Sequence, residues 1–119
     1  MKNKERIRQR YLKDPLPIRL AGLAADLSRV ASSARRASGG EATLAMLEES
    51  QYFIEWTAAE VAPEVGEELV NLQLMLALWR RAWPEVEGSH TQRTLLAVQA
   101  KQWSDRVLQL AERGSLAIA

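Results

Sequence analysis

The stretch VGEELVNLQLMLALWRRAW, residues 65–83, sets the fold class of this chain. Its apolar residues recur at alternating intervals of three and four, which is the spacing of one face of an α-helix: Val65, Leu69, Leu72, Leu76, Trp79 and Trp83. Acidic residues lie in its first turns and two arginines near its end, which matches the helix dipole at both ends. Because Val70, Leu74, Met75 and Leu78 widen this stripe, we expect it to be the most buried helix, ending at Pro84.

Three other segments repeat the spacing of three and four, and none alternates with the period of two that is typical of a strand. The first covers residues 16–34, where Asp14 can cap the helix and Pro15 suits its first position. We expect the pair Gly39-Gly40 to stop this helix before the next one begins.

The remaining two helical segments are bounded by residues that favour the end or the start of a helix. One covers residues 44–61 and is expected to end at Ala62-Pro63, because the residue before a proline avoids the helical region. The other covers residues 96–110, and Ser89 with Gln92 makes a capping box ahead of it.

Four amphipathic helices with short links predict an all-α protein in which neighbouring helices run antiparallel. We therefore expect an up-down-up-down four-helix bundle over residues 14–119, preceded by a basic N-terminal arm over residues 1–13. This length suits one domain with one hydrophobic core. No apolar run reaches the ~18–20 residues that a membrane helix needs, so we expect no transmembrane segment and a cytoplasmic location.

Charge is distributed very unevenly along this chain, although its formal net charge is only +1. Residues 1–38 carry ten Lys and Arg against three Asp and Glu, whereas residues 39–88 carry two against ten. Such opposed segments bear on association and solubility, and they do not identify a reaction.

The arm holds six basic residues against one acid, and its candidate partner-binding residues are Lys4, Arg6, Arg8, Arg10 and Tyr11. It could bind the phosphates of a nucleic acid or lie on an anionic lipid surface. It could instead rest on the acidic surface of the second and third helices, in the same or a second subunit, or form a disordered tail. The excess of acidic residues after position 13 and the lack of a nucleic-acid motif argue against the first interpretation.

The second helix has an aromatic and acidic side that lies off its apolar stripe, formed by Glu49, Tyr52, Trp56 and Glu60. Aromatic residues beside charges suit a protein interface, where they often anchor binding. The alternative is that Trp56 packs over a neighbouring helix of the same chain, since tryptophan is usually mostly buried.

No set of residues in the sequence is arranged for catalysis or for holding a cofactor. The chain has no cysteine and a single histidine, and it contains no glycine-rich phosphate loop. Bundles can hold two metals with paired Glu-x-x-His motifs, but the one such spelling, Glu87 to His90, crosses Gly88 and has no second copy. We expect no catalytic residue, no metal and no cofactor.

The chain contains the strings RQRY and DPLP at residues 8–11 and 14–17, and LEES and YFIEW at residues 47–50 and 52–56. With these strings it resembles a family of small all-helical cyanobacterial proteins of unknown function. The resemblance implies a soluble cytoplasmic bacterial protein and carries over no functional residue.

These observations predict a non-enzymatic helical protein–protein interaction module that self-associates, with a homodimer as the expected form. Opposed charges predict that association weakens with salt and on deletion of residues 2–13. The alternative function is binding of a nucleic acid or another anionic surface through the arm.

Overall fold

The computed structural model describes residues 3–113, so the ends of the predicted arm and bundle segments, residues 1–2 and 114–119, lie outside the described residues. All regular elements in this range are helices, which confirms the all-α prediction. The five α-helices are α1 (Lys4–Lys13), α2 (Leu16–Ala34), α3 (Gly40–Thr57), α4 (Pro63–Glu87) and α5 (His90–Ala111). Single 3₁₀ turns at Ala37–Gly39 and Ala58–Glu60 flank α3.

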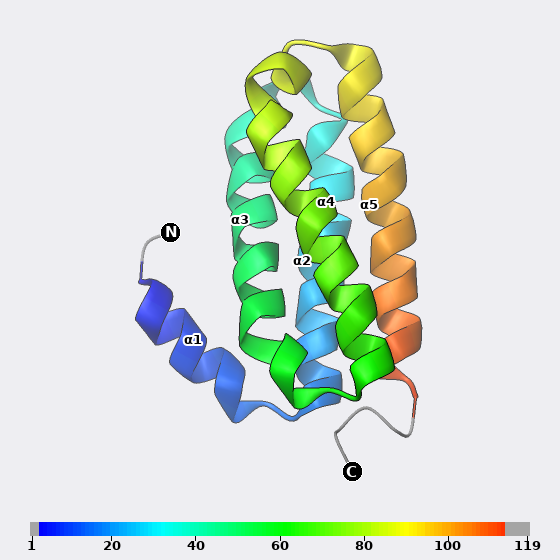
Figure 1. The fold of residues 1–119 in the computed structure, drawn as a ribbon. Coiled ribbons are helices and arrows are strands. Elements are labelled where there is room, and N and C mark those ends of the chain that lie inside the picture. Colours follow the sequence, from blue (N-terminus) through cyan, green and yellow to red (C-terminus); the bar gives the residue numbers. More distant parts are fainter. Residues whose placement is uncertain (1–2, 114–119) are drawn as a thin grey trace.

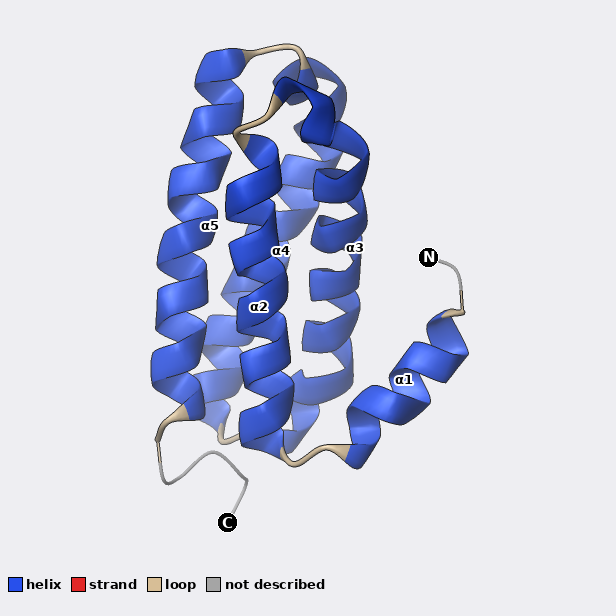
Figure 2. Cartoon of the chain, turned by 180° about the vertical axis from the view of Figure 1, so that it is seen from behind, coloured by secondary structure: helices blue, strands red, loops and turns tan. Residues whose placement is uncertain are grey.

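The four long helices lie side by side, and successive ones run in alternating directions along the chain (Figure 1). Each packs on its neighbours in the order α2, α3, α4, α5, with α5 returning to α2. Helices α2 and α4 are therefore diagonal to each other, as the views from the two sides agree (Figure 2). The short α1 lies outside these four, beside α3.

Among the described helices, α2 makes its most extensive contact with α5. Small buried residues lie on both helices: Ala24 on α2, and Ala97, Ala100 and Ser104 on α5. The Ser104 hydroxyl donates a hydrogen bond of 2.8 Å to the Ala24 carbonyl, which satisfies a buried polar group across the contact. With nine of its 19 residues buried, α2 is the central helix of the core.

The start of α2 differs by one residue from the prediction. Pro15 is the N-cap and Leu16 the first helical residue, whereas Asp14 caps the C-terminus of α1, its N–H donating to the Tyr11 carbonyl at 3.2 Å. Asp14 has an extended backbone because it precedes a proline, which disfavours the helical region.

Gly39 and Gly40 begin a helix, whereas the sequence predicted that they only stop one. Helix α2 ends at Ala34, and α3 starts at Gly40. Both glycines are buried, and a Cβ on Gly39 would collide with the Ser33 backbone. Close approach of the two chain segments therefore explains the glycine at position 39.

Helix α3 ends at Thr57, and Pro63 lies at the first position of α4 instead of closing the helix before it. That position favours proline, because its missing N–H would have no partner within the helix. Half of the predicted capping box is present at α5, where the Ser89 hydroxyl accepts a hydrogen bond of 3.2 Å from the Gln92 backbone N–H. The backbone N–H of Ser89 donates to the Val86 carbonyl at 3.0 Å, in place of the Gln92 side chain that a full capping box would use.

The prediction that Pro84 ends the third long helix is wrong. Helix α4 continues through it to Glu87. Pro84 is exposed, so water can solvate the carbonyl that its missing N–H leaves free.

The prediction that residues 65–83 form the most buried helix is also wrong. Only six of the 25 residues of α4 are buried, and the second apolar stripe of the sequence, at Val70, Leu74 and Leu78, faces outward. This helix lies diagonally across from α2, so its far side has no neighbouring helix in the described chain.

Candidate interaction surface

The predicted arm is an ordered helix whose aromatic residue is buried. Tyr11 is 7% exposed, and its ring stacks on Phe53 of α3 with centroids 4.0 Å apart and planes 9° apart. Ile7, one turn earlier, packs against the same core. An apolar pair spaced four residues apart thus attaches α1 to α3. Residues 4–13 form a helix in the structure, in contrast to the interpretation of the arm as a disordered tail.

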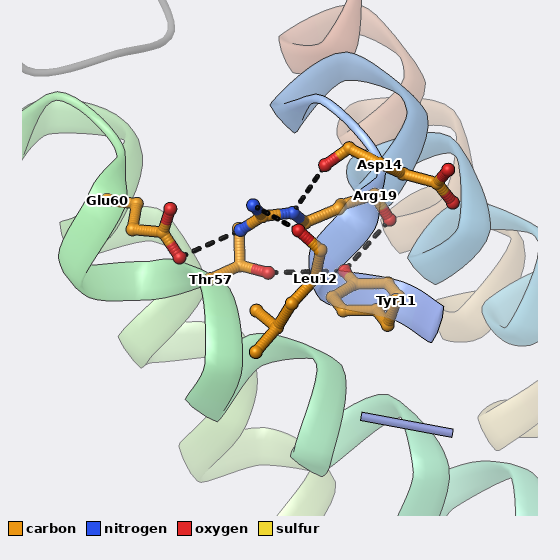
Figure 3. A network of polar contacts seen from close by, with 6 residues as sticks. All are labelled: Tyr11, Leu12, Asp14, Arg19, Thr57 and Glu60. Atoms are coloured by element: carbon orange, nitrogen blue, oxygen red, sulfur yellow. Dashed lines mark hydrogen bonds and ion pairs between the residues drawn. The ribbon is translucent and has the colours of Figure 1, made fainter. Parts of the chain in front are cut away.

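A polar network fixes the junction between α1 and α2 (Figure 3). The Tyr11 hydroxyl donates to the Arg19 carbonyl at 2.9 Å and accepts from the Thr57 hydroxyl at 3.2 Å. Burial raises the pKa of Tyr11, which remains a neutral donor. The hydroxyl therefore connects three helices at one point.

The buried guanidinium of Arg19 completes this network. It donates to the backbone carbonyls of Asp14 at 2.8 Å and Leu12 at 3.2 Å, and pairs with the carboxylate of Glu60 at 2.8 Å. Glu60, a predicted partner-binding residue, is thus engaged within the chain (Figure 3).

The aromatic side of α3 also contacts residues of the same chain. Trp56 packs at 5.6 Å from Tyr52 and 5.9 Å from Tyr11, centroid to centroid. The Lys4 ammonium lies 4.1 Å from the centre of the Tyr52 ring, a cation–π contact. The structure therefore brings Lys4 and Tyr11 of the predicted arm together with Tyr52 and Trp56 of α3 within one chain.

The other predicted acid, Glu49, lies beside a buried carboxyl that the sequence did not single out. Asp26 on α2 is 1% exposed, and one of its oxygens accepts from Arg29 at 2.8 Å. Its other oxygen is buried without a hydrogen-bond partner, and Glu49 is the neighbouring acid that acts on this carboxyl. Burial first, and then the neighbouring Glu49, raise the pKa of Asp26 to about 8, so Asp26 is mostly protonated at neutral pH.

The remaining basic residues of α1 point outward. Arg6, Arg10 and Lys13 are exposed, and Arg8 forms only a loose ion pair with Glu5 at 3.6 Å. Arg10 and Lys13 border a groove of about 550 Å³ between α1 and α3, which also contacts Glu49. The groove has mixed charge and opens to solvent.

A different surface is exposed, apolar and continuous. Val70, Leu74 and Leu78 lie one turn apart on α4 and are 58%, 60% and 52% exposed. These three form what we call the α4 ridge. Single exposed apolar residues are ordinary, but contiguous ones on one helix face mark an interaction site.

The surface beside the α4 ridge is apolar as well. A groove of about 250 Å³ between α4 and α5 runs past Met75 and Trp103. A bidentate ion pair borders it, since Arg106 donates to both oxygens of Glu68 at 2.8 and 2.5 Å, which lowers the pKa of Glu68. On α5, Leu95 is also a large apolar residue that is 46% exposed.

The sequence contained the signal for the α4 ridge, but the interpretation was wrong. Residues 70, 74 and 78 formed the second apolar stripe from which deep burial was predicted. Helical periodicity shows that a face is apolar and leaves open whether the chain itself covers that face.

Among residues 3–113, no three His, Asp or Glu side chains converge as they would around a metal ion, and no helix is long and apolar enough to cross a membrane. Comparisons with protein families, with curated proteins and with solved structures find no match for this chain.

Proposed function

We propose that this chain is a non-enzymatic helical interaction module that self-associates through the α4 ridge. In this proposal α2 to α5 form the stable unit, an antiparallel four-helix bundle, and α1 is an accessory helix attached to it. The observation that carries the proposal is the outward stripe of Val70, Leu74 and Leu78 on a helix whose opposite face builds the core.

Covering the α4 ridge would release apolar surface from water in both copies at once. Full burial of an aliphatic side chain stabilises by about 1.5–3 kcal/mol, and each ridge residue keeps more than half of its surface exposed in the single chain. Association entropy offsets much of this gain, so the contact suits a weak, reversible dimer.

The contacts within the chain support α4 rather than α1 as the dimer surface. Tyr11 and Trp56 already pack together, and Glu60 pairs with Arg19. A partner that used them would have to replace these contacts, whereas the α4 ridge is covered by nothing in the described chain.

The test of self-association is sedimentation velocity of the full chain from low micromolar to submillimolar concentration. We expect the weight-average mass to rise from 13.4 kDa toward twice that value. Because apolar burial dominates the proposed contact, moderate salt should weaken the dimer only slightly. A chain that stays monomeric over the whole range contradicts the proposal.

A second candidate function is the binding of an anionic surface through α1. The observation in its favour is that Arg6, Arg10 and Lys13 stay exposed on one helix, where they could neutralise phosphates. Fluorescence anisotropy of a labelled single-stranded RNA should then show binding that falls steeply with salt. Replacing the three basic residues with Gln should abolish it, and no anisotropy change at low salt rejects this function.

A further inference from the structure

We propose that the second copy packs antiparallel along α4, about a two-fold axis at Leu74, with Glu67 of each copy paired to Arg81 of the other. This inference rests on the proposed self-association and specifies its partner and register. Every residue that it uses is exposed on α4.

The α4 ridge is symmetric about Leu74 in sequence. Val70 lies four residues before Leu74 and Leu78 four residues after it. A two-fold axis through Leu74 therefore places Leu74 against its own copy and Val70 against Leu78 of the other copy, on both sides of the axis. The three apolar side chains of each ridge then meet apolar side chains of the other copy.

The charges that flank the α4 ridge obey the same symmetry with opposite signs. Glu67 lies seven residues before Leu74 and Arg81 seven residues after it, so both stay within about 20° of the ridge on an ideal helix. In the antiparallel register each Glu67 faces an Arg81, which gives two equivalent ion pairs per dimer. A surface that is complementary to itself in shape and in charge fits a second copy of the same chain.

Neither residue can satisfy the other within one chain. Fourteen residues separate them, which is about 21 Å along the helix, and both are exposed. A parallel pairing of two copies would instead set Glu67 against Glu67 and Arg81 against Arg81. Like charges facing each other oppose that arrangement, so the same two residues favour one direction over the other.

Charge exchange tests the register directly. Glu67→Arg and Arg81→Glu should each raise the dimer dissociation constant about tenfold at low salt, because each change appears twice in the dimer and turns two attractions into repulsions. The double variant that carries both changes should recover affinity to within about twofold of the unchanged chain, since every pair is re-formed with its signs exchanged. Sedimentation equilibrium measures all four dissociation constants.

The matched control is Glu55→Arg, the same charge reversal on an exposed position of α3. It should leave the dissociation constant within about twofold, which separates a local pairing from a change of net charge. If both single variants dimerise normally while the chain still self-associates, or if the double variant is weaker than either single one, the antiparallel register is wrong and the proposed self-association survives. If the unchanged chain is monomeric, a second copy is not the occupant and both proposals fail.

Discussion

Replacing Leu74 with glutamate is expected to leave the protein folded and monomeric. In the proposed dimer this residue lies on the two-fold axis, so the substitution brings two carboxylates together inside an apolar contact. We expect the dissociation constant to rise at least a hundredfold, which corresponds to about 2.7 kcal/mol of association free energy. The single chain should tolerate the change, because Leu74 is 60% exposed.

Sedimentation velocity and thermal unfolding of the Leu74→Glu variant check both halves of this expectation. The matched control is Ile18→Glu on α2, which is 54% exposed and lies on the helix diagonal to α4. That variant should dimerise as the unchanged chain does. A Leu74→Glu variant that still dimerises, or one that unfolds, contradicts the assignment of the α4 ridge to a partner.

Replacing Asp26 with asparagine is expected to change how the stability of the fold depends on pH. Burial and the adjacent Glu49 raise the pKa of Asp26 to about 8 in the folded chain, against 3.8 as its ordinary value. The folded state therefore binds a proton that the unfolded state has released throughout the range between these values. The contribution of Asp26 to the free energy of unfolding is therefore fully present below about pH 4. It is lost as the pH rises through 8, with a slope of at most about 1.4 kcal/mol per pH unit.

Urea unfolding of the two proteins from pH 5 to 9 measures this difference. The groups that face Asp26 are Arg29 on its own helix, Glu49 on α3 and the neutral Tyr11 on α1. Asparagine keeps the shape and carries no titrating proton, so the Asp26→Asn variant should show a flatter profile and gain relative stability toward pH 9. Parallel profiles for the two proteins would show that Asp26 titrates alike in the folded and unfolded chains.

The helices could be predicted from the sequence because the period of their apolar residues is local information. The ends of the helices were harder to predict from the sequence. Helix α4 continues through Pro84 because this position is exposed. Gly39 is required because a Cβ there would collide with the backbone of Ser33, and a local sequence pattern does not show this contact.

The contacts of several predicted site residues lie within one chain, which is one of the alternatives that the sequence left open. Tyr11 and Trp56 do meet, yet they meet within one chain, because Phe53 presents a ring on which Tyr11 stacks. Charge and aromatic content indicate that a surface can form contacts. The packing of α1 onto α3 then determines that residues of the same chain make those contacts. Likewise, the stripe at Leu74 is apolar in the sequence, and only the position of α4 opposite α2 shows that no helix among residues 3–113 covers it.

The most direct test of the antiparallel dimer is a distance between two copies of one spin label. The chain has no cysteine, so Glu64→Cys provides a unique attachment site on the exposed start of α4, ten residues before Leu74. Twenty residues of helix separate the two labels in the proposed dimer, and pulsed dipolar spectroscopy should give a distance of about 30 Å or slightly more. A separation near 10 Å, as in a parallel pair, or the absence of dipolar coupling at concentrations where the chain should be dimeric, contradicts the account.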